Sequence, residues 1–394
     1  MKKISTIFLL GLGFVLLGCS PSGSEQSQMT AEAPPAADAD IDKQVEEYIQ
    51  KFPYQDTYNY AVRYTNSDPA NLNVWVLGQE PVLVKAGEDK VVRMNNDTYY
   101  KMAFVDLTGG PVVLGSSAPA EDRFSSFQLM DDRNVNYQNE IHPAGEYTLY
   151  FGAPPEKVVG KAIEVPSLLS VVIVRVEVKN KDDADDTAAA QSVFNGITIS
   201  GEQPAEFPKV DVLGVYSGSV QADAEQKLDE TFANVAFRLT AVGPDQELGK
   251  DVSYLNHSAG TKGGWGAPGT AHSSYETLFF DGNGDTLDGG KGDYSVTTEP
   301  PPVDAFWSLT VYDTARGGFL HPNKDDRYHI NNTTAVANDD GTVTFNFKSS
   351  CAGADINCLE VPVGEFDIVA RYYLPHESIR SGEWTLPAIN LPEA

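Results

Sequence analysis

Residues 95–100 read NNDTYY and place two amides, a carboxylate and two phenols at the start of a predicted strand. Such groups can converge on a polyhydroxylated ligand, but Asn and Asp side chains also bond to the backbone of a turn. Both interpretations stay open, and the turn is favoured. The candidates from this stretch and the strands after it are Asn95, Asn96 and Gln128 for ligand binding and, as weak candidates for catalysis, Asp97, Tyr99, Asp106 and Arg123.

A second group of aromatic and polar side chains begins in the string PPVDAFWSLTVYD, residues 301–313. Phe306 and Trp307 are adjacent, so in a strand they face opposite sides and only one can enter a given core. An exposed ring would stack on a sugar or an apolar ligand, whereas tryptophan in a sandwich is more often core. The ligand-binding candidates from this region are Trp307, Tyr312, Asn323, Arg327 and Tyr328.

Asp281, Asn283 and Asp285 alternate within DGNGD, and three oxygen-bearing side chains at this spacing could surround a calcium ion. The EF-hand pattern fails, because its sixth position is Thr286 and its twelfth is Gly292. A hairpin turn is the favoured interpretation. Calcium is a weak alternative, and no other metal or cofactor is evident.

Motifs that would define a reaction are missing from the sequence. No His-Glu-x-x-His pair supports zinc hydrolysis, and no Gly-x-Ser-x-Gly elbow supports a serine hydrolase. Paired carboxylates for glycoside cleavage stay open, because 56 acidic residues offer too many pairs. The sequence therefore does not decide whether the protein is an enzyme.

The elements that would position these groups are mostly β-strands. Residues 300–330 predict a strand with two unequal faces, a turn at Gly317 and Gly318, and a second strand. Turn signals at the spacing typical of a sandwich accompany further strands from Val74 onward, beginning with VWVL, PVLVKA and KVVRM. Helices are predicted at residues 40–52, from the acids at 185–186 to the glycine at 196, and at residues 222–242.

These elements predict a mostly β protein with several parts. An N-terminal β-sandwich at residues 41–180 is followed by a helical connector at 181–260 and a C-terminal jelly-roll-like sandwich at 261–394. A glycine-rich loop, GTKGGWGAPG at residues 260–269, opens the last part.

Two stretches together resemble a pair of bacterial domains of unknown function, numbered 1254 and 1214. The first is MNNDTYYKMAFVDLTGGPVVL with the arginine and glutamine of DRFSSFQLMDDR, and the second runs through PPVDAFWSLTVYD to GEWTLPAI. The resemblance spans about residues 45–390 and implies an immunoglobulin-like sandwich, a helical connector and a jelly roll. It assigns no reaction and no residue role. A long helical insert common in such proteins is replaced by the loop around Trp265, which would leave any pocket there more open.

Residues 1–18 have the form of a signal peptide, in which Lys2 and Lys3 precede an apolar run that ends in LLGC at residues 16–19. The segment resembles bacterial lipoprotein precursors, which implies cleavage before Cys19, palmitate on that residue and, with Ser20 next, the outer membrane. The alternative is an ordinary signal peptide with a chance cysteine. Residues 19–40 are too polar to bury a core and predict a flexible tether.

The cysteines and the net charge indicate which compartment and which partners suit the protein. With Cys19 acylated, Cys351 and Cys358 remain as a pair in an oxidising compartment, which predicts a disulfide. The net charge of −28 argues against nucleic acid as a partner. Because the acidic pairs are scattered along the chain, a solvated acidic surface is favoured over one acidic site.

Three functions are predicted, in this order. The first is a lipid-anchored protein of the cell envelope, facing the periplasm or the cell surface, that binds a small molecule or glycan between two β domains. The second is an envelope hydrolase or lyase that uses carboxylate, tyrosine or arginine chemistry. The third is a structural or assembly role in which the sandwiches form oligomers.

Overall fold

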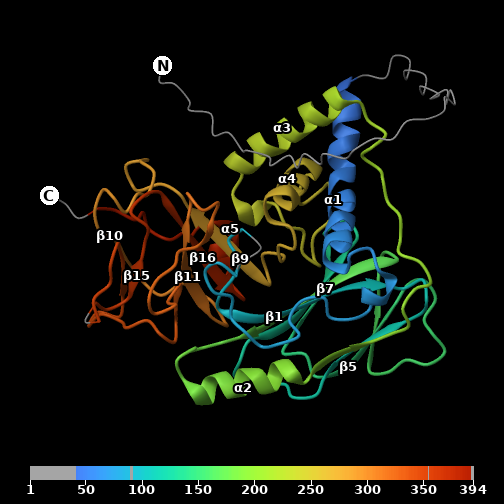
Figure 1. Cartoon of the computed structure of the whole chain (residues 1–394), viewed down its shortest axis with the longest axis horizontal. Helices are drawn as coiled ribbons and strands as arrows, with labels where there is room; N and C mark the ends of the chain where they lie inside the picture. Colours follow the sequence, from blue (N-terminus) through green and yellow to red (C-terminus); the bar gives the residue numbers. More distant parts are fainter. Residues whose placement is uncertain (1–40, 89–91, 354, 392–394) are drawn as a thin grey trace, which may run out of the picture. The chain divides into compact units, whose positions relative to one another are not determined.

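Residues 41–88, 92–353 and 355–391 are described in the computed structural model of the chain, and β-strands are their main secondary structure (Figure 1). The described strands form four sheets in which most neighbours run antiparallel. The predicted fold class, a mostly β protein of sandwiches with a short helical connector, is confirmed. The described residues all belong to one compact unit.

The N-terminal sandwich consists of two four-stranded sheets. One sheet has the order β1 (Thr98–Asp106), β7 (Leu169–Glu177), β3 (Ser125–Asp131) and β4 (Asn136–Ile141). The other has the order β6 (Lys161–Glu164), β5 (Gly145–Tyr150), β2 (Val112–Ser116) and β8 (Ile197–Ser200). Apolar side chains from both sheets, among them Phe127, Leu149 and Val172, form the core between them. Strand β7 is paired on both edges and buried along its whole length, as its near-continuous apolar sequence indicates.

Helix α2 (Ala184–Asn195) packs against this sandwich. The Asp183 side chain accepts the Asp185 N–H at 2.9 Å and caps the start, and Gly196 follows the end. Val193 and Phe194 contribute to the sandwich core. The helix predicted from acidic residues at its start and a glycine at its end is therefore confirmed.

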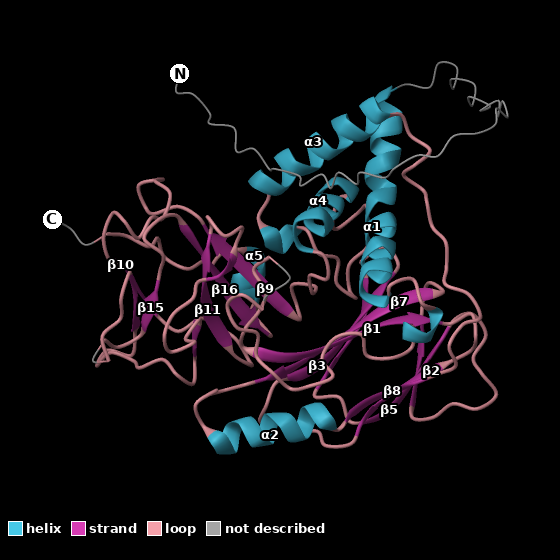
Figure 2. Cartoon of the chain, viewed as in Figure 1, coloured by secondary structure: helices cyan, strands magenta, loops and turns pink. Residues whose placement is uncertain are grey.

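Helices α1 (Ile41–Thr65), α3 (Gly218–Asn234) and α4 (Tyr254–Gly264) pack against one another (Figures 1 and 2). Val45, Ile49 and Leu228 lie in their shared apolar cluster. Ser217 and Ser253 cap α3 and α4 by accepting backbone N–H groups. None of the helices in the described ranges combines the length and the apolar character that a bilayer crossing requires.

The C-terminal sandwich also has two sheets. One contains β12 (Phe319–Leu320), β11 (Trp307–Asp313), β16 (Phe366–Tyr373) and β9 (Ser273–Leu278) in this order, with β13 (His329–Asn331) paired to β11. The other contains β10 (Tyr294–Thr298), β14 (Val343–Lys348) and β15 (Cys358–Glu360). The core between them includes Leu309, Phe345 and Ile368. The short helices are α5 (Glu377–Ser381), η1 (Pro69–Asn71) and η2 (Phe237–Leu239).

The strand, turn and second strand predicted within residues 300–330 are confirmed. Strand β11 is followed by Gly317 and Gly318, whose φ angles of 83° and 79° favour glycine, and β12 then pairs back antiparallel. Strand β11 is an interior strand, paired with β16 on one side and with β12 and β13 on the other, whereas β12 lies at the end of the sheet.

Within residues 74–94 the predicted strands VWVL and PVLVKA are wrong, and the predicted strand KVVRM falls partly on residues 89–91, which lie outside the described residues. In the described part of this segment Leu77 makes one isolated bridge to Met102, and no regular strand follows. Pro81, which has no N–H, interrupts any ladder, and Val84 packs against the apolar cluster around Tyr312 and Tyr328. Trp75 and Leu83 instead pack against the core of the N-terminal sandwich. The apolar pattern of this segment therefore comes from packing against both sandwiches and not from strand pairing.

The predicted helix boundaries also need correction. The helix expected at residues 40–52 continues through Pro53 to Thr65, and the helix expected at 222–242 is α3, which ends at Asn234. The first residues of the expected glycine-rich loop, 260–264, are the last part of α4. Gly260 lies so close to Thr240 that a larger side chain would not fit there. Trp265 follows this helix, and its ring stacks on that of Tyr60 at 4.2 Å.

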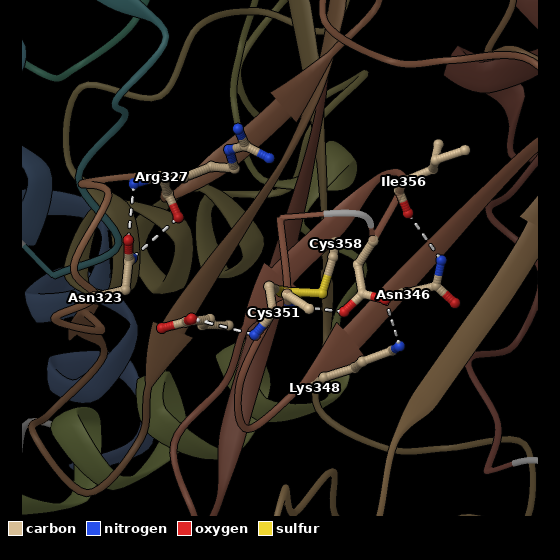
Figure 3. Close-up of a disulfide and its surroundings, with 10 residues drawn as sticks. Asn323, Arg327, Asn346, Lys348, Cys351, Ile356 and Cys358 are labelled. Carbon is tan, nitrogen blue, oxygen red and sulfur yellow. Dashed lines mark hydrogen bonds and ion pairs between the residues drawn. A yellow bond between two sulfur atoms is a disulfide. The ribbon is translucent and has the colours of Figure 1, made fainter.

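A disulfide joins Cys351 to Cys358, with 5.9 Å between their Cα atoms, and this pairing confirms the prediction (Figure 3). Hydrogen bonds hold the loop to the strands beside it. Asn346 donates to the Ile356 carbonyl at 3.0 Å, and the Lys348 ammonium lies 3.2 Å from the Asp355 carboxylate.

The disulfide should stabilise the C-terminal domain by restricting the unfolded chain. Replacing both cysteines, as Cys351→Ser with Cys358→Ser, should lower the free energy of unfolding by about 2 kcal/mol. Urea denaturation with and without a thiol reductant measures this. Reductant should destabilise the unmodified protein and leave the double variant unchanged. Equal midpoints for the two proteins in the absence of reductant would contradict the expected contribution.

Candidate functional site

Strands β11 and β16 carry an apolar face and a polar face, and both are buried. Leu309, Val311 and Ile368 point into the C-terminal core. The residues that alternate with them face the other way, because successive side chains of a strand point to opposite sides. We call this second set the polar face; its buried polar members are Ser308, Thr310, Tyr312, Asp367, Arg371 and Tyr373.

The polar face is covered by the segment that leads into β1. Asp97 accepts hydrogen bonds from the Ser308 hydroxyl and, at 3.3 Å, from the Tyr373 hydroxyl. Asn95 donates its side-chain amide to the Tyr373 oxygen and accepts the Asp97 N–H at 2.6 Å. Asp97 and Asn95 come from the N-terminal half, so these bonds join the two sandwiches.

Two further contacts attach the same segment to the polar face. Arg93 donates to both carboxylate oxygens of Asp367 at 2.9 Å, as a bidentate pair. Tyr312 donates its hydroxyl to the Met94 carbonyl at 2.6 Å. The Asn96 amide donates to the Val84 carbonyl, and its oxygen lies 3.3 Å from His329 Nδ1. Residues 93–97 are therefore fixed by side chains and carbonyls, without a strand ladder.

Arg371 lies at the centre of the polar face. Its Nη1 donates to the Thr310 hydroxyl at 3.1 Å, and its Nη2 donates to the Tyr312 hydroxyl and the Arg93 carbonyl, both at 2.8 Å. Its Nε has no hydrogen-bond partner within the described residues. Burial opposes the charge, but the Tyr312 and Asp97 oxygens outweigh burial and raise the pKa of Arg371. The guanidinium remains positive.

A second buried arginine, Arg175, lies on β7. Its Nε donates to the Tyr100 hydroxyl at 3.1 Å and its Nη1 donates to the Gln128 amide oxygen. Gln128 in turn donates to Asn136 at 2.7 Å and to the Gly266 carbonyl at 3.2 Å, so the loop after α4 holds Arg175 in place. Although burial acts against it, the neighbouring tyrosine oxygens raise the pKa of Arg175.

Three tyrosines, Tyr100, Tyr275 and Tyr373, lie near Arg175. Burial raises the pKa of Tyr100 and Tyr373, and nearby Asp97 raises both further. Their phenols therefore stay neutral near pH 7 and can act as hydrogen-bond donors. The Arg371 guanidinium lies over the Tyr275 ring, 5.4 Å from its centre.

Several buried polar atoms beside Arg175 have no partner within the described residues. They include Nε2 of His272 and the hydroxyls of Thr98 and Ser126. Ser126 is the cross-strand partner of Arg175, and Thr98 is the cross-strand partner of Glu177. Because Glu177 is two residues after Arg175 on β7, all four side chains lie on the same face of the sheet. Burial, with a smaller effect of Arg175, lowers the pKa of His272 to about 3, and burial raises the pKa of Glu177 to about 7. His272 is therefore neutral.

The structure does not bring the four weak catalytic candidates together. Asp97 and Asp106 lie at opposite ends of β1. Tyr99 points into the sandwich core and packs edge-on against Phe194 at 5.8 Å. Arg123 forms an ion pair with Asp186. Burial raises the pKa of Tyr99, and the nearby Arg123 charge opposes that shift in part.

Asp106 belongs to a different surface feature. Its Oδ1 accepts the Thr108 N–H at 2.8 Å, and it lines a cavity of about 750 Å³ together with Thr108, Glu206 and Lys209. None of the residues that bind Asp97 lines this cavity.

Most ligand-binding candidates of the second region lie outside the polar face. Phe306 and Trp307 do face opposite sides, but both are buried, so neither ring is free to stack on a ligand. Tyr328 is buried and donates to Asp326 at 2.7 Å. The side-chain amide of Asn323 donates to the Arg327 carbonyl and accepts the Arg327 N–H, and so closes a turn (Figure 3). The Arg327 side chain is exposed.

The segment DGNGD forms a turn in which Asp281 bonds to the backbone. Its Oδ1 accepts the N–H groups of Asn283 at 2.9 Å and Asp285 at 3.0 Å, so this oxygen is already used. Within the described ranges, no group of three or more His, Cys, Asp or Glu side chains is arranged to hold a metal ion.

The structure thus unites Asn95, Asn96, Asp97, Tyr312 and, through Arg175, Gln128. Sequence reasoning missed both central arginines. Each had a signal: Arg175 interrupts the apolar run VVIVRVEV, and Arg371 interrupts FDIVARYY. A charged residue inside a strand that is otherwise apolar predicts a buried and specifically satisfied charge.

The fold and this site define a class of protein in which two β-sandwiches meet through a buried polar layer beside a group of helices. Residues 76–200 match the family model described as protein of unknown function (DUF1254), and residues 272–377 match the model described as protein of unknown function (DUF1214). The resemblance seen in the sequence is confirmed for these two families in this order. Comparison with curated proteins gave no match.

Solved structures show a similar fold. The crystal structure of the VPA0106 protein from Vibrio parahaemolyticus aligns with a TM-score of 0.73 and 19% identity, covering 90% of this chain and 100% of that one. An uncharacterised protein from Burkholderia cenocepacia aligns with a TM-score of 0.50 and 13% identity, covering 90% of each chain. At these identities the similarity concerns the fold alone.

The Arg93–Asp367 pair should contribute to the stability of the contact between the sandwiches. Arg93→Ala would leave the buried Asp367 carboxylate without its cation and should lower the free energy of unfolding by about 3 kcal/mol. Arg380→Ala, which breaks an exposed pair with Glu377, should cost less than about 1 kcal/mol. Denaturant unfolding compares the two variants. Equal losses would contradict a structural role for the buried pair.

His272 should make the protein acid-sensitive. Because its pKa is lowered to about 3, the unfolded chain binds a proton below about pH 6.5 while the folded protein does not. Relative to His272→Gln, the unmodified protein should lose up to about 1.4 kcal/mol per pH unit between pH 6 and pH 4. Denaturant unfolding at several pH values measures this difference. A difference that stays constant over that range would show that His272 protonates in the folded state.

Proposed function

We propose that this chain is a lipid-anchored protein of the cell envelope that binds a small polar molecule or glycan between its two β-sandwiches. The observation that carries the proposal is the buried polar layer between them. Asn95 and Asp97 enter it from the first sandwich, and Tyr312, Arg371 and Tyr373 enter it from the second.

Stability alone does not account for such a layer. Two buried guanidinium groups and several unpartnered polar atoms cost free energy that apolar side chains of similar size would avoid. Clusters of this kind are typical of places where a protein recognises another molecule. The polar layer therefore supports a binding role.

The envelope location rests on residues 1–40, which lie outside the described residues. The basic start, the apolar run and LLGC at residues 16–19 support export and acylation of Cys19. The Cys351–Cys358 disulfide supports an oxidising compartment independently.

The hydrolase or lyase hypothesis has no specific observation in its favour. Asp97, the one candidate within the polar layer, accepts hydrogen bonds from Ser308 and Tyr373, and the Asp106 and Arg123 contacts lie elsewhere. Binding is the function that the geometry supports best.

A ligand screen by thermal unfolding of the full chain in detergent tests the binding role. A ligand at one hundred times its dissociation constant adds about 2.7 kcal/mol, which should raise the midpoint by several degrees. For a glycan or another neutral ligand Asp97→Asn should abolish the shift, whereas Asn323→Ala, in the distant turn, should retain it. If no glycan, nucleotide, lipid, carboxylate or phosphate shifts the unmodified protein, the proposed function is wrong.

Acylation is tested separately by metabolic labelling with palmitate and by fractionation. Cys19→Ser should lose the label and leave the membrane fraction. The matched control, Cys351→Ser with Cys358→Ser, should keep both properties because it leaves Cys19 in place. Label on the Cys19→Ser variant would refute the anchor.

A further inference from the structure

We propose that the group recognised in the polar layer is a small carboxylate or phosphate, held between Arg175 and Arg371 and bonded by the Tyr275 hydroxyl. This inference rests on the proposed binding function and narrows it to one ligand chemistry. Three observations support it: the charge of the buried arginines, the hydrogen-bond donors beside them that have no partner, and the position of the Tyr275–Phe237 ring pair.

The charge balance of the layer favours an anion. Arg93 is matched by Asp367 in a bidentate pair, whereas neither Arg175 nor Arg371 forms an ion pair with a carboxylate of the described residues. The Asp97 carboxylate raises the pKa of Arg371 and so offsets its charge, while also accepting from Ser308 and Tyr373. The charge of Arg175 remains, because the groups that support it are neutral tyrosines.

Glu177 does not cancel the remaining positive charge. Its pKa is raised to about 7, chiefly by burial, so it is only partly ionised near neutral pH, and its Oε2 accepts the Phe124 N–H at 3.0 Å. A region with excess positive charge is thus buried in a protein whose net charge is −28. The acidic side chains on the surface are too far away to pair with the buried arginines. A small bound anion could pair with them instead.

Donors are available on the walls of this region. Nε of Arg371 lacks a partner within the described residues, and so do the hydroxyls of Thr98 and Ser126 and Nε2 of His272. These side chains are nine-tenths or more buried, so water outside the protein does not solvate them. The Tyr275 hydroxyl likewise forms no hydrogen bond within the described ranges. An oxyanion accepts several such donors at once.

An aromatic pair lies where this region approaches the surface. The rings of Tyr275 and Phe237 are nearly parallel, at 3°, with centres 6.1 Å apart. Both line a cavity of about 10 Å³ together with Arg238, whose Nε is also unpartnered within the described residues. The cavity has room for about one water molecule. Entry of a carboxylate or phosphate by this route would require the Tyr275 and Phe237 rings to separate.

Titration calorimetry on the full chain in detergent tests the inference, with sodium phosphate and sodium acetate at an ionic strength held constant with sodium chloride. At least one of the two should bind to the unmodified protein. Tyr275→Phe removes one hydroxyl and keeps the ring, so it should weaken binding about tenfold. Tyr58→Phe is the matched control, because Tyr58 also packs on a phenylalanine at 6.1 Å and should bind like the unmodified protein.

The possible results separate this inference from the proposed function. If neither anion binds but a neutral glycan from the thermal screen does, and Asp97→Asn abolishes its shift, the anion inference fails and the binding function stands. If no compound binds, both fail. Equal affinity of an anion for the unmodified protein and Tyr275→Phe would place the anion elsewhere and overturn the inference. Because Arg371→Lys keeps the charge but loses Nε, weaker binding by a folded Arg371→Lys variant supports it.

Discussion

A strand that is buried on both faces must find a partner for every polar group that it carries, and this constraint governs how the two sandwiches meet. Strands β11 and β16 present apolar side chains to their own core and polar ones to the N-terminal half. A buried polar group without a partner costs about 1–3 kcal/mol. Residues 93–97 satisfy many of these groups because their backbone is not engaged in a ladder, so the carbonyls of Arg93 and Met94 accept from Arg371 and Tyr312.

Interactions between charges are stronger in the buried polar layer than on the surface of this protein. Exposed pairs such as Lys43–Glu47 are screened by water and contribute little. Inside, the same charges are poorly screened, and tyrosine oxygens support both buried guanidinium groups. An acidic exterior and a basic interior therefore coexist in one chain, which the net charge alone does not reveal.

Sequence patterns predicted local structure well and tertiary partners poorly. The alternation of residues 306–312 correctly indicated two faces of β11, and the cysteine pair correctly indicated a disulfide. The apolar residues of PVLVKA looked like a strand because an apolar pattern cannot tell a sheet from packing against another domain. Asn95, Asp97 and Tyr312 were chosen for their chemistry, but Arg371 and Tyr373 were missed, since the contact between residues 97 and 373 is decided by tertiary structure.

The bonds of Asp97 to Ser308 and Tyr373 span 211 and 276 positions of the chain. Closing loops of that size is entropically expensive, so these contacts are expected to form after each sandwich has assembled around its own local pairings. The junction then ranks among the last parts of the protein to become ordered and the first to come apart in partial unfolding. Transient parting of the two modules, not only motion of single side chains, would in that case set how quickly a bound molecule is exchanged.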